Sequence, residues 1–130
     1  MTIKVLQPAG WPRPKGYANG MVTQGRHVFV AGQVGWDEQQ QFPNTLAEQV
    51  RQALKNIVTV LHEADARPGH IVRLTWYVTS RDEYQAQLEQ IGEAYREIMG
   101  RHFPTMTVVQ VVALMEAQAK VEIEATAVVP

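Results

Sequence analysis

The stretch that decides the fold is Val121-Glu122-Ile123-Glu124-Ala125, near the end of a chain of 130 residues. Apolar and acidic side chains alternate in it, and this period of two is typical of a β-strand with one buried face and one polar face. We therefore predict a strand over residues 120–129, in which Glu122 and Glu124 point to the same side. A neighbouring strand is predicted over residues 105–112, joined to the first by residues 113–119.

Upstream of these strands, the apolar residues change to the spacing of helices. A stripe recurs every three or four residues from Leu46 to Leu61, which predicts an amphipathic helix with Asn44 as its N-cap and an end near Ala66. A second helix is predicted from Ser80 or Asp82 to Met99. The segment 71–79, between the helices, is rich in β-branched and aromatic residues and is predicted to be a strand.

The N-terminal part is predicted to hold short strands and turns. Residues 3–6 have the pattern of an edge strand, and the Pro- and Gly-rich residues 7–20 are expected to be extended. Residues 21–24 and 27–31 flank Gln24-Gly25-Arg26 and are interpreted as a hairpin. The resulting order, ββαβαββ, predicts an α+β fold with two helices on one face of the sheet, in one domain spanning residues 1–130.

Composition excludes several classes of function. The chain has 12 Lys+Arg, 13 Asp+Glu and no cysteine, so disulfides, thiolate metal sites and a cysteine nucleophile are excluded. Its four histidines lack metal-ligand spacing, and we expect neither metal nor cofactor. No apolar run approaches the roughly 20 residues of a membrane span, and no basic cluster favours nucleic acid. We predict a cytoplasmic location without a membrane partner.

The face of the sheet without helices needs a cover. The valines of residues 108–112, together with Val121 and Ile123, are expected to supply apolar side chains to both faces of the last two strands. Because no sequence remains to cover the second face, a further copy of the chain is the economical cover, and we predict a homo-oligomer. The alternative is that these strands lie at the centre of the sheet.

Three groups of residues together resemble the RidA/YjgF family, also labelled the endoribonuclease L-PSP or translation-initiation-inhibitor family. They are Gly16-Tyr17 with Ala31-Gly32-Gln33-Val34, then Tyr77-Val78-Thr79, and finally Val108 to Val111 with the Val121–Ala125 stretch. The resemblance runs from about Tyr17 to Val128. It implies a chorismate-mutase-like fold, a homotrimer and ligand clefts between subunits. In the well-studied branch these clefts hydrolyse 2-imino acids without metal or cofactor.

The resemblance also assigns residues to the cleft. Glu122 is implied to order or activate the attacking water, and Tyr17 and Gly32 are implied to shape the ligand pocket. Met106 stands where that branch has the arginine that binds the substrate carboxylate, in the segment Pro104-Thr105-Met106-Thr107. A thioether offers neither the charge nor the paired donors of a guanidinium. Lys15, Arg13 and Arg73 are possible replacements.

Two further residues are weaker candidates for ligand binding. Trp36 could wall the pocket, or it could be a core or interface anchor, and Gln110 could donate a hydrogen bond to a ligand. For Met106, Glu122 and Tyr17, packing or solvated roles remain the alternatives.

The leading functional hypothesis is hydrolytic deamination of a small imine or enamine that is not a standard 2-imino acid. A non-catalytic trimeric module that binds a small metabolite is the alternative, so the sequence leaves open whether the chain is an enzyme. RNA cleavage, which the family label suggests, is disfavoured by the net charge of −1.

Overall fold

A four-stranded sheet with the order β3-β6-β4-β5 forms the centre of the computed structural model, which describes residues 3–130. Met1 and Thr2, part of the predicted domain, lie outside this range. β6 pairs antiparallel with both β3 and β4, while β4 and β5 are parallel. The bounds are β3 (Arg26–Val34), β4 (Ile71–Val78), β5 (Thr105–Gln110) and β6 (Val121–Val129). Each of these four strands was predicted from the sequence.

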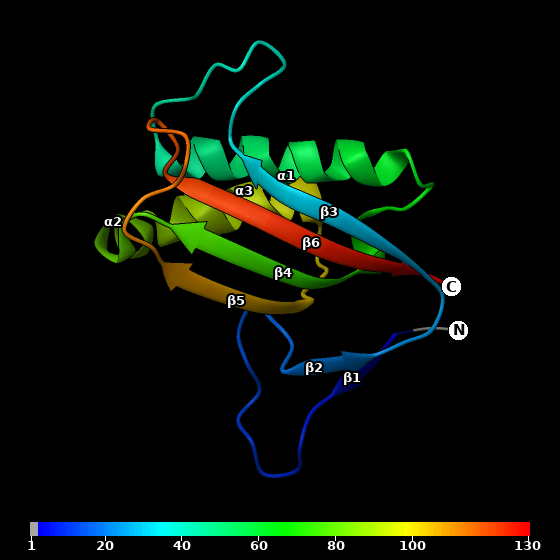
Figure 1. Cartoon of the computed structure of the whole chain (residues 1–130). Coiled ribbons are helices and arrows are strands. Elements are labelled where there is room, and N and C mark those ends of the chain that lie inside the picture. The colour runs from blue at the N-terminus through cyan, green and yellow to red at the C-terminus, as the bar shows by residue number, and fades with distance from the viewer. Residues whose placement is uncertain (1–2) are drawn as a thin grey trace.

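Two longer helices cover one face of this sheet, α1 (Leu46–His62) and α3 (Leu88–Met99), as Figure 1 shows. The parallel connection from β4 to β5 runs through the short α2 (Arg81–Ala86) and through α3, as a parallel pair requires. A one-turn 3₁₀-helix, η1 (Pro68–His70), precedes β4. The α+β class predicted from the sequence, with helices on one face, is confirmed.

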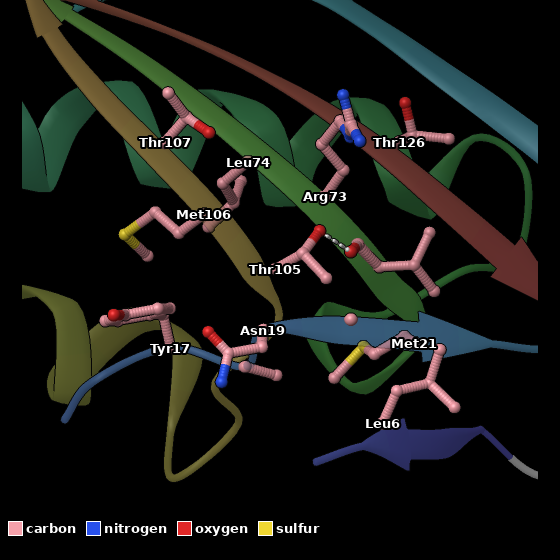
Figure 2. A pocket seen from close by; sticks show the side chains of 13 residues that line it. Leu6, Tyr17, Asn19, Met21, Arg73, Leu74, Thr105, Met106, Thr107 and Thr126 are labelled. Carbon is pink, nitrogen blue, oxygen red and sulfur yellow. Dashed lines mark hydrogen bonds between the residues drawn. The ribbon is translucent and has the colours of Figure 1, made fainter. Parts of the chain in front are cut away.

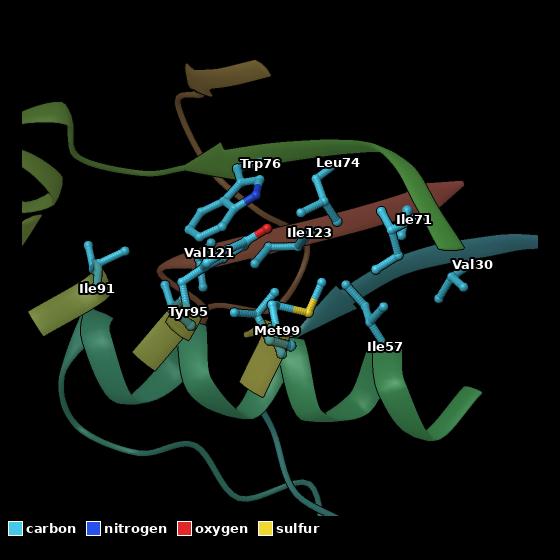
Figure 3. Close-up of a cluster of buried hydrophobic side chains, with 14 of the residues drawn as sticks. Val30, Ile57, Ile71, Leu74, Trp76, Ile91, Tyr95, Met99, Val121 and Ile123 are labelled. Carbon is cyan, nitrogen blue, oxygen red and sulfur yellow. The ribbon is translucent and has the colours of Figure 1, made fainter. Parts of the chain in front are cut away.

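The hydrophobic core lies between the helices and the sheet (Figure 3). Leu74, Trp76 and Ile123 project from the sheet, and they pack against the helices that carry Ile57 and Tyr95. Each of these side chains is buried. Since core residues of β4 and β6 alternate with partly exposed ones, each strand has one core face and one open face.

The predicted hairpin is wrong. β2 (Gly20–Val22) pairs with β1 (Lys4–Leu6) in a separate two-stranded sheet, and β3 pairs with β6 alone. Gly25 has a φ of +152°, and a Cβ there would lie 2.1 Å from the backbone oxygen of Val129. The glycine therefore lets the chain pass close to the end of β6, and it does not close a turn between β2 and β3.

Both predicted helices differ in detail. Thr45, and not Asn44, caps α1, because its Oγ1 accepts a hydrogen bond from the Glu48 N–H at 3.1 Å. The second helix begins after the Ser80 cap as expected but breaks at Gln87 into α2 and α3. The Gln87 side chain accepts a hydrogen bond from the Ala47 N–H at 2.9 Å, so this break provides a partner for the first turn of α1.

The open face of the sheet is more polar than predicted. Val121 and Ile123 both lie in the core, so β6 presents Glu122, Glu124 and Thr126 to the open side. The expectation that the last two strands supply apolar side chains to both faces of the sheet is therefore wrong for β6, whose Val121 and Ile123 share the core face. Exposed apolar side chains on this side are fewer, chiefly Phe29 and Val109. The homo-oligomer remains a prediction.

Candidate functional site

Glu122 lies against Gly32 on the open face of the sheet. The register of β3 against β6 shifts between Val30 and Gln33, which makes a bulge that contains Gly32. A Cβ on Gly32 would lie 2.1 Å from Glu122 Oε2. The missing side chain of Gly32 is therefore what allows the Glu122 carboxylate to occupy this position.

Glu124 forms a hydrogen-bonded pair that the sequence did not predict. The Tyr77 hydroxyl donates to Glu124 Oε1 at 2.5 Å, and in the strand register Tyr77 stands directly opposite Glu122. The hydrogen bond to Glu124, helped by partial burial, raises the pKa of Tyr77. The Tyr77 hydroxyl thus stays protonated and keeps Glu124 in a hydrogen bond. The Glu122 carboxylate has no such hydrogen-bond partner among residues 3–130. The alternation of Arg73, Thr75 and Tyr77 was the available signal for this placement.

These residues line a cleft of about 290 Å³. The loop between β5 and β6 contributes its other side through Ala113, Leu114 and Met115, and the Met115 side chain is 92% exposed. We call this cleft, with Gly32, Tyr77, Glu122 and Glu124, the carboxylate cleft. Its oxygen atoms can accept protons from a bound water, which is what general acid–base chemistry requires.

The loop that borders the carboxylate cleft is held by a buried glutamine of α1. Gln49 is 1% exposed, and its Nε2 donates to the carbonyl oxygens of Pro43 and Gln118, both at 3.1 Å. Its Oε1 accepts from the Lys120 N–H at 2.8 Å. One side chain therefore ties the start of α1 to the end of this loop, a role that a glutamine in a helical pattern does not reveal.

Tyr17 and Met106 lie together at a different part of the molecule. The Ala18 N–H donates to the Pro104 carbonyl oxygen at 3.0 Å and Ala18 bridges to Thr105, which holds the Tyr17 segment beside the start of β5. Figure 2 shows the two side chains next to each other and pointing the same way. They border two cavities, of about 540 and 560 Å³.

The possible replacements for the missing arginine are placed differently. Arg73 lines the first of these cavities, but its guanidinium points away from Met106 and Tyr17, toward Thr126 (Figure 2). Lys15 lines the second cavity together with Met106, and Arg96 of α3 lines it too. Arg96 was missed because its position on a predicted amphipathic helix is typical of a solvated charge.

Two weaker candidates make other contacts. The Gln110 side chain accepts a hydrogen bond from the Arg81 N–H at 2.6 Å, so it provides a partner for the first turn of α2. The Trp36 ring packs against Phe42, with centroids 5.7 Å apart, and the Trp36 carbonyl accepts from Asn56 at 2.9 Å. Both contacts are structural.

Within one chain, the site residues that were expected to act together therefore lie in two separate places. Glu122 and Gly32 border the carboxylate cleft, whereas Tyr17 and Met106 border the cavities beside β5, and these cavities share no lining residue with that cleft. Among residues 3–130, no group of three or more metal-ligating side chains gathers at either place. Within the same range, no helix is long and apolar enough to cross a bilayer.

Known proteins resemble this chain over nearly its whole length. The family model described as endoribonuclease L-PSP matches residues 12–129. A RutC family protein of Leuconostoc mesenteroides is 30% identical over 98% of both chains, and the 2-iminobutanoate/2-iminopropanoate deaminase of Bos taurus is 29% identical over 96% of this chain and 89% of its own.

Solved structures of known proteins also match this chain over nearly its whole length. A Rid-family protein of unknown function from Yersinia pestis, YyfB, superposes with a TM-score of 0.86 at 29% identity, over 99% of this chain and all of that one. TdcF of E. coli with bound serine superposes with a TM-score of 0.71 at 30% identity, over 98% of this chain and 99% of that one. The chain belongs to the endoribonuclease L-PSP family, which includes the RidA/YjgF proteins.

Proposed function

We propose that this protein is a homotrimer that hydrolyses a small imine or its enamine tautomer in clefts between subunits. The observation that carries the proposal is the Glu122 carboxylate held over Gly32 on the open face of the sheet. Relatives at 28–29% identity named 2-iminobutanoate/2-iminopropanoate deaminase support the class of reaction. A second copy could bring Tyr17 and Met106 of one chain to the carboxylate cleft of another.

The chemistry needs one water and one proton acceptor. Glu122 takes a proton from the water as its oxygen adds to the carbon of the C=N bond, which gives a carbinolamine. The nitrogen receives that proton from Glu122, which then takes the proton of the carbinolamine hydroxyl and delivers it to the nitrogen as the carbon–nitrogen bond breaks, so the products are a carbonyl compound and ammonia. Glu122 can serve both steps because it gives back the proton that it took.

Met106 shifts the proposal away from the smallest 2-imino acids. An arginine at this position could bind a carboxylate through two parallel hydrogen bonds, whereas methionine contributes only apolar, polarisable surface. The ligand is therefore expected to gain part of its binding energy from apolar contact beside Met106 and Tyr17.

The test measures ammonia release from imines that an amino-acid oxidase generates in the assay, after subtraction of spontaneous hydrolysis. The wild type should accelerate at least one imine, and Glu122→Gln should abolish this acceleration. Glu63→Gln, an exposed carboxylate at the end of α1, is the control and should leave it unchanged. Equal rates for wild type and Glu122→Gln would refute the proposal, as would a light-scattering mass equal to one 14.6 kDa chain.

A non-catalytic binding module is the second candidate, and Met106 favours it, because an apolar cleft can bind a metabolite without reacting with it. Thermal stabilisation by a metabolite that is never consumed would support the binding module. Turnover of that metabolite would exclude it.

A further inference from the structure

An aromatic cavity lies between the edge strand β5 and the helices α2 and α3. It has a volume of about 560 Å³, within the range of small-molecule sites. Five aromatic side chains line it: Tyr17, Trp76, Tyr84, Tyr95 and Phe103. Tyr95 and Phe103 stack with centroids 6.0 Å apart, and Tyr84 meets Trp76 edge to face at 6.3 Å. Four of the five rings of the cavity wall are therefore oriented by contacts with one another.

This cavity differs from the hydrophobic core in its hydrogen bonding and in its exposure to solvent. Trp76 is 2% exposed, yet its indole N–H has no hydrogen-bond partner in the described part of the chain. Tyr17 and Leu88 lie at the cavity with 42% and 54% of their surfaces exposed. A hydrophobic core rarely contains a buried donor without a partner or apolar side chains open to solvent, because both are unfavourable. Both features are common where a ligand binds.

Two positively charged side chains line the same cavity. Lys15 and Arg96 line the cavity, and neither forms a salt bridge with any residue from 3 to 130. Arg96 follows Gly92 by one turn of α3, and a Cβ on Gly92 would lie 3.2 Å from Arg96 Nη1. The glycine therefore leaves room for the guanidinium to lie along the helix beside the cavity. Arg96 can offer the paired donors that Met106 lacks.

We propose that this cavity binds a flat aromatic carboxylate, with the ring between the aromatic walls and the carboxylate on Arg96, assisted by Lys15. Met106 suits such a ligand, since a thioether makes favourable contacts with an aromatic ring. The inference rests on the proposed function in one respect: Tyr17 and Met106 belong to both sites, so the imines hydrolysed here would be those of aromatic amino acids. Binding itself does not depend on turnover.

The test is calorimetric titration of the assembled protein with three stable probes. Phenylpyruvate carries both the ring and the carboxylate, 2-oxobutanoate lacks the ring, and phenylacetone lacks the carboxylate. Phenylpyruvate should bind about ten-fold or more tightly than either, because it alone makes the apolar and the charge-assisted contacts. Equal affinity for phenylpyruvate and 2-oxobutanoate would overturn the proposal, as would no binding of phenylpyruvate, the result expected if a second copy filled the cavity.

Arg96→Gln should weaken phenylpyruvate binding about ten-fold, and Arg96→Lys should restore part of it. Arg67→Gln removes the same charge from an exposed residue before η1 that does not line the cavity, and it should change nothing. In an NMR spectrum, phenylpyruvate should shift the indole N–H signal of Trp76, identified through Trp76→Phe. An unaffected Arg96→Gln variant or an unmoved Trp76 signal would contradict the assignment.

Turnover separates this inference from the proposed function. Tight binding of phenylpyruvate without hydrolysis of any imine refutes the proposed function and supports the aromatic site. Hydrolysis of small imines without preference for aromatic ones, together with equal binding of the probes, refutes the aromatic site alone.

Discussion

Gly32→Ala tests whether the position of the Glu122 carboxylate matters for catalysis. The new methyl carbon would lie 2.1 Å from Glu122 Oε2 and 2.9 Å from its Cδ. Non-bonded atoms normally stay about 3.5 Å apart, so the carboxylate must move by more than about 1 Å. A displacement of this size costs roughly 10²-fold in rate when the group must contact reacting atoms.

The fold should tolerate the same change. Gly32 is exposed and its φ lies outside the left-handed region, and Glu122 is partly exposed, so the carboxylate can swing toward solvent. We expect the free energy of unfolding to change by less than about 1 kcal/mol. Gly69→Ala is the matched control, because a Cβ at Gly69 meets no atom within 4 Å. It should change neither rate nor stability.

The assay compares ammonia release with thermal unfolding for each variant. Gly32→Ala should lose about 100-fold in kcat while it unfolds near the wild-type temperature. Added to Glu122→Gln, it should cause no further loss, because both changes remove the same group. A Gly32→Ala enzyme with more than half of the wild-type rate would refute a catalytic position for Glu122.

Three other outcomes are expected. Gln49→Met removes three buried hydrogen bonds and should lower the free energy of unfolding by about 2–4 kcal/mol in a urea titration. An unchanged free energy of unfolding would contradict a stabilising role for the Gln49 hydrogen bonds. Gly92→Ala should raise this free energy by about 0.5–1 kcal/mol yet weaken phenylpyruvate binding, because the methyl displaces Arg96; unchanged binding would separate Arg96 from the ligand. Burial raises the pKa of Tyr84 and Tyr95 above the ordinary value of 10.0, so the folded state keeps protons that the unfolded state loses. Stability should therefore fall as the pH rises above 10.0, and urea titrations across this range that show no fall would contradict it.

The parts of the fold that the sequence predicts are those with a local cause. Alternation in β6 places Glu122 and Glu124 on one face, and the apolar stripe places α1 on the sheet, because each pattern reports which face is buried. The pairing of β2 was wrong because Gly25 satisfies local turn chemistry equally well. Its actual reason, the close approach to the Val129 oxygen, depends on residues about 100 positions away, and no local pattern contains it.

The site likewise has features that a local pattern predicts and features that depend on distant residues. Strand alternation is enough to expect Glu122 on the open face, but not to expect Gly32 beneath its carboxylate or Tyr77 bonded to Glu124. Those contacts depend on strand register and on a bulge, which are set by the whole sheet. The hydrogen bond that Gln110 accepts from the Arg81 N–H has a related cause: it joins the end of β5 to a helix start, and sequence spacing does not report such contacts.

The division of the site on one chain gives a direct test of the subunit cleft. If each cleft combines Tyr17 of one copy with Glu122 of another, the variants Tyr17→Ala and Glu122→Gln are each impaired, because the first lacks the aromatic wall and the second lacks the carboxylate. Each variant still supplies the half of the cleft that the other lacks. In mixed trimers formed by co-expression in equal amounts, about one cleft in four would have both halves intact, because each cleft draws its halves from two different copies. Activity should therefore return to about a quarter of the wild-type value. A monomer, or a cleft within one chain, would give no more than the average of the two variants, and that result would refute the shared cleft.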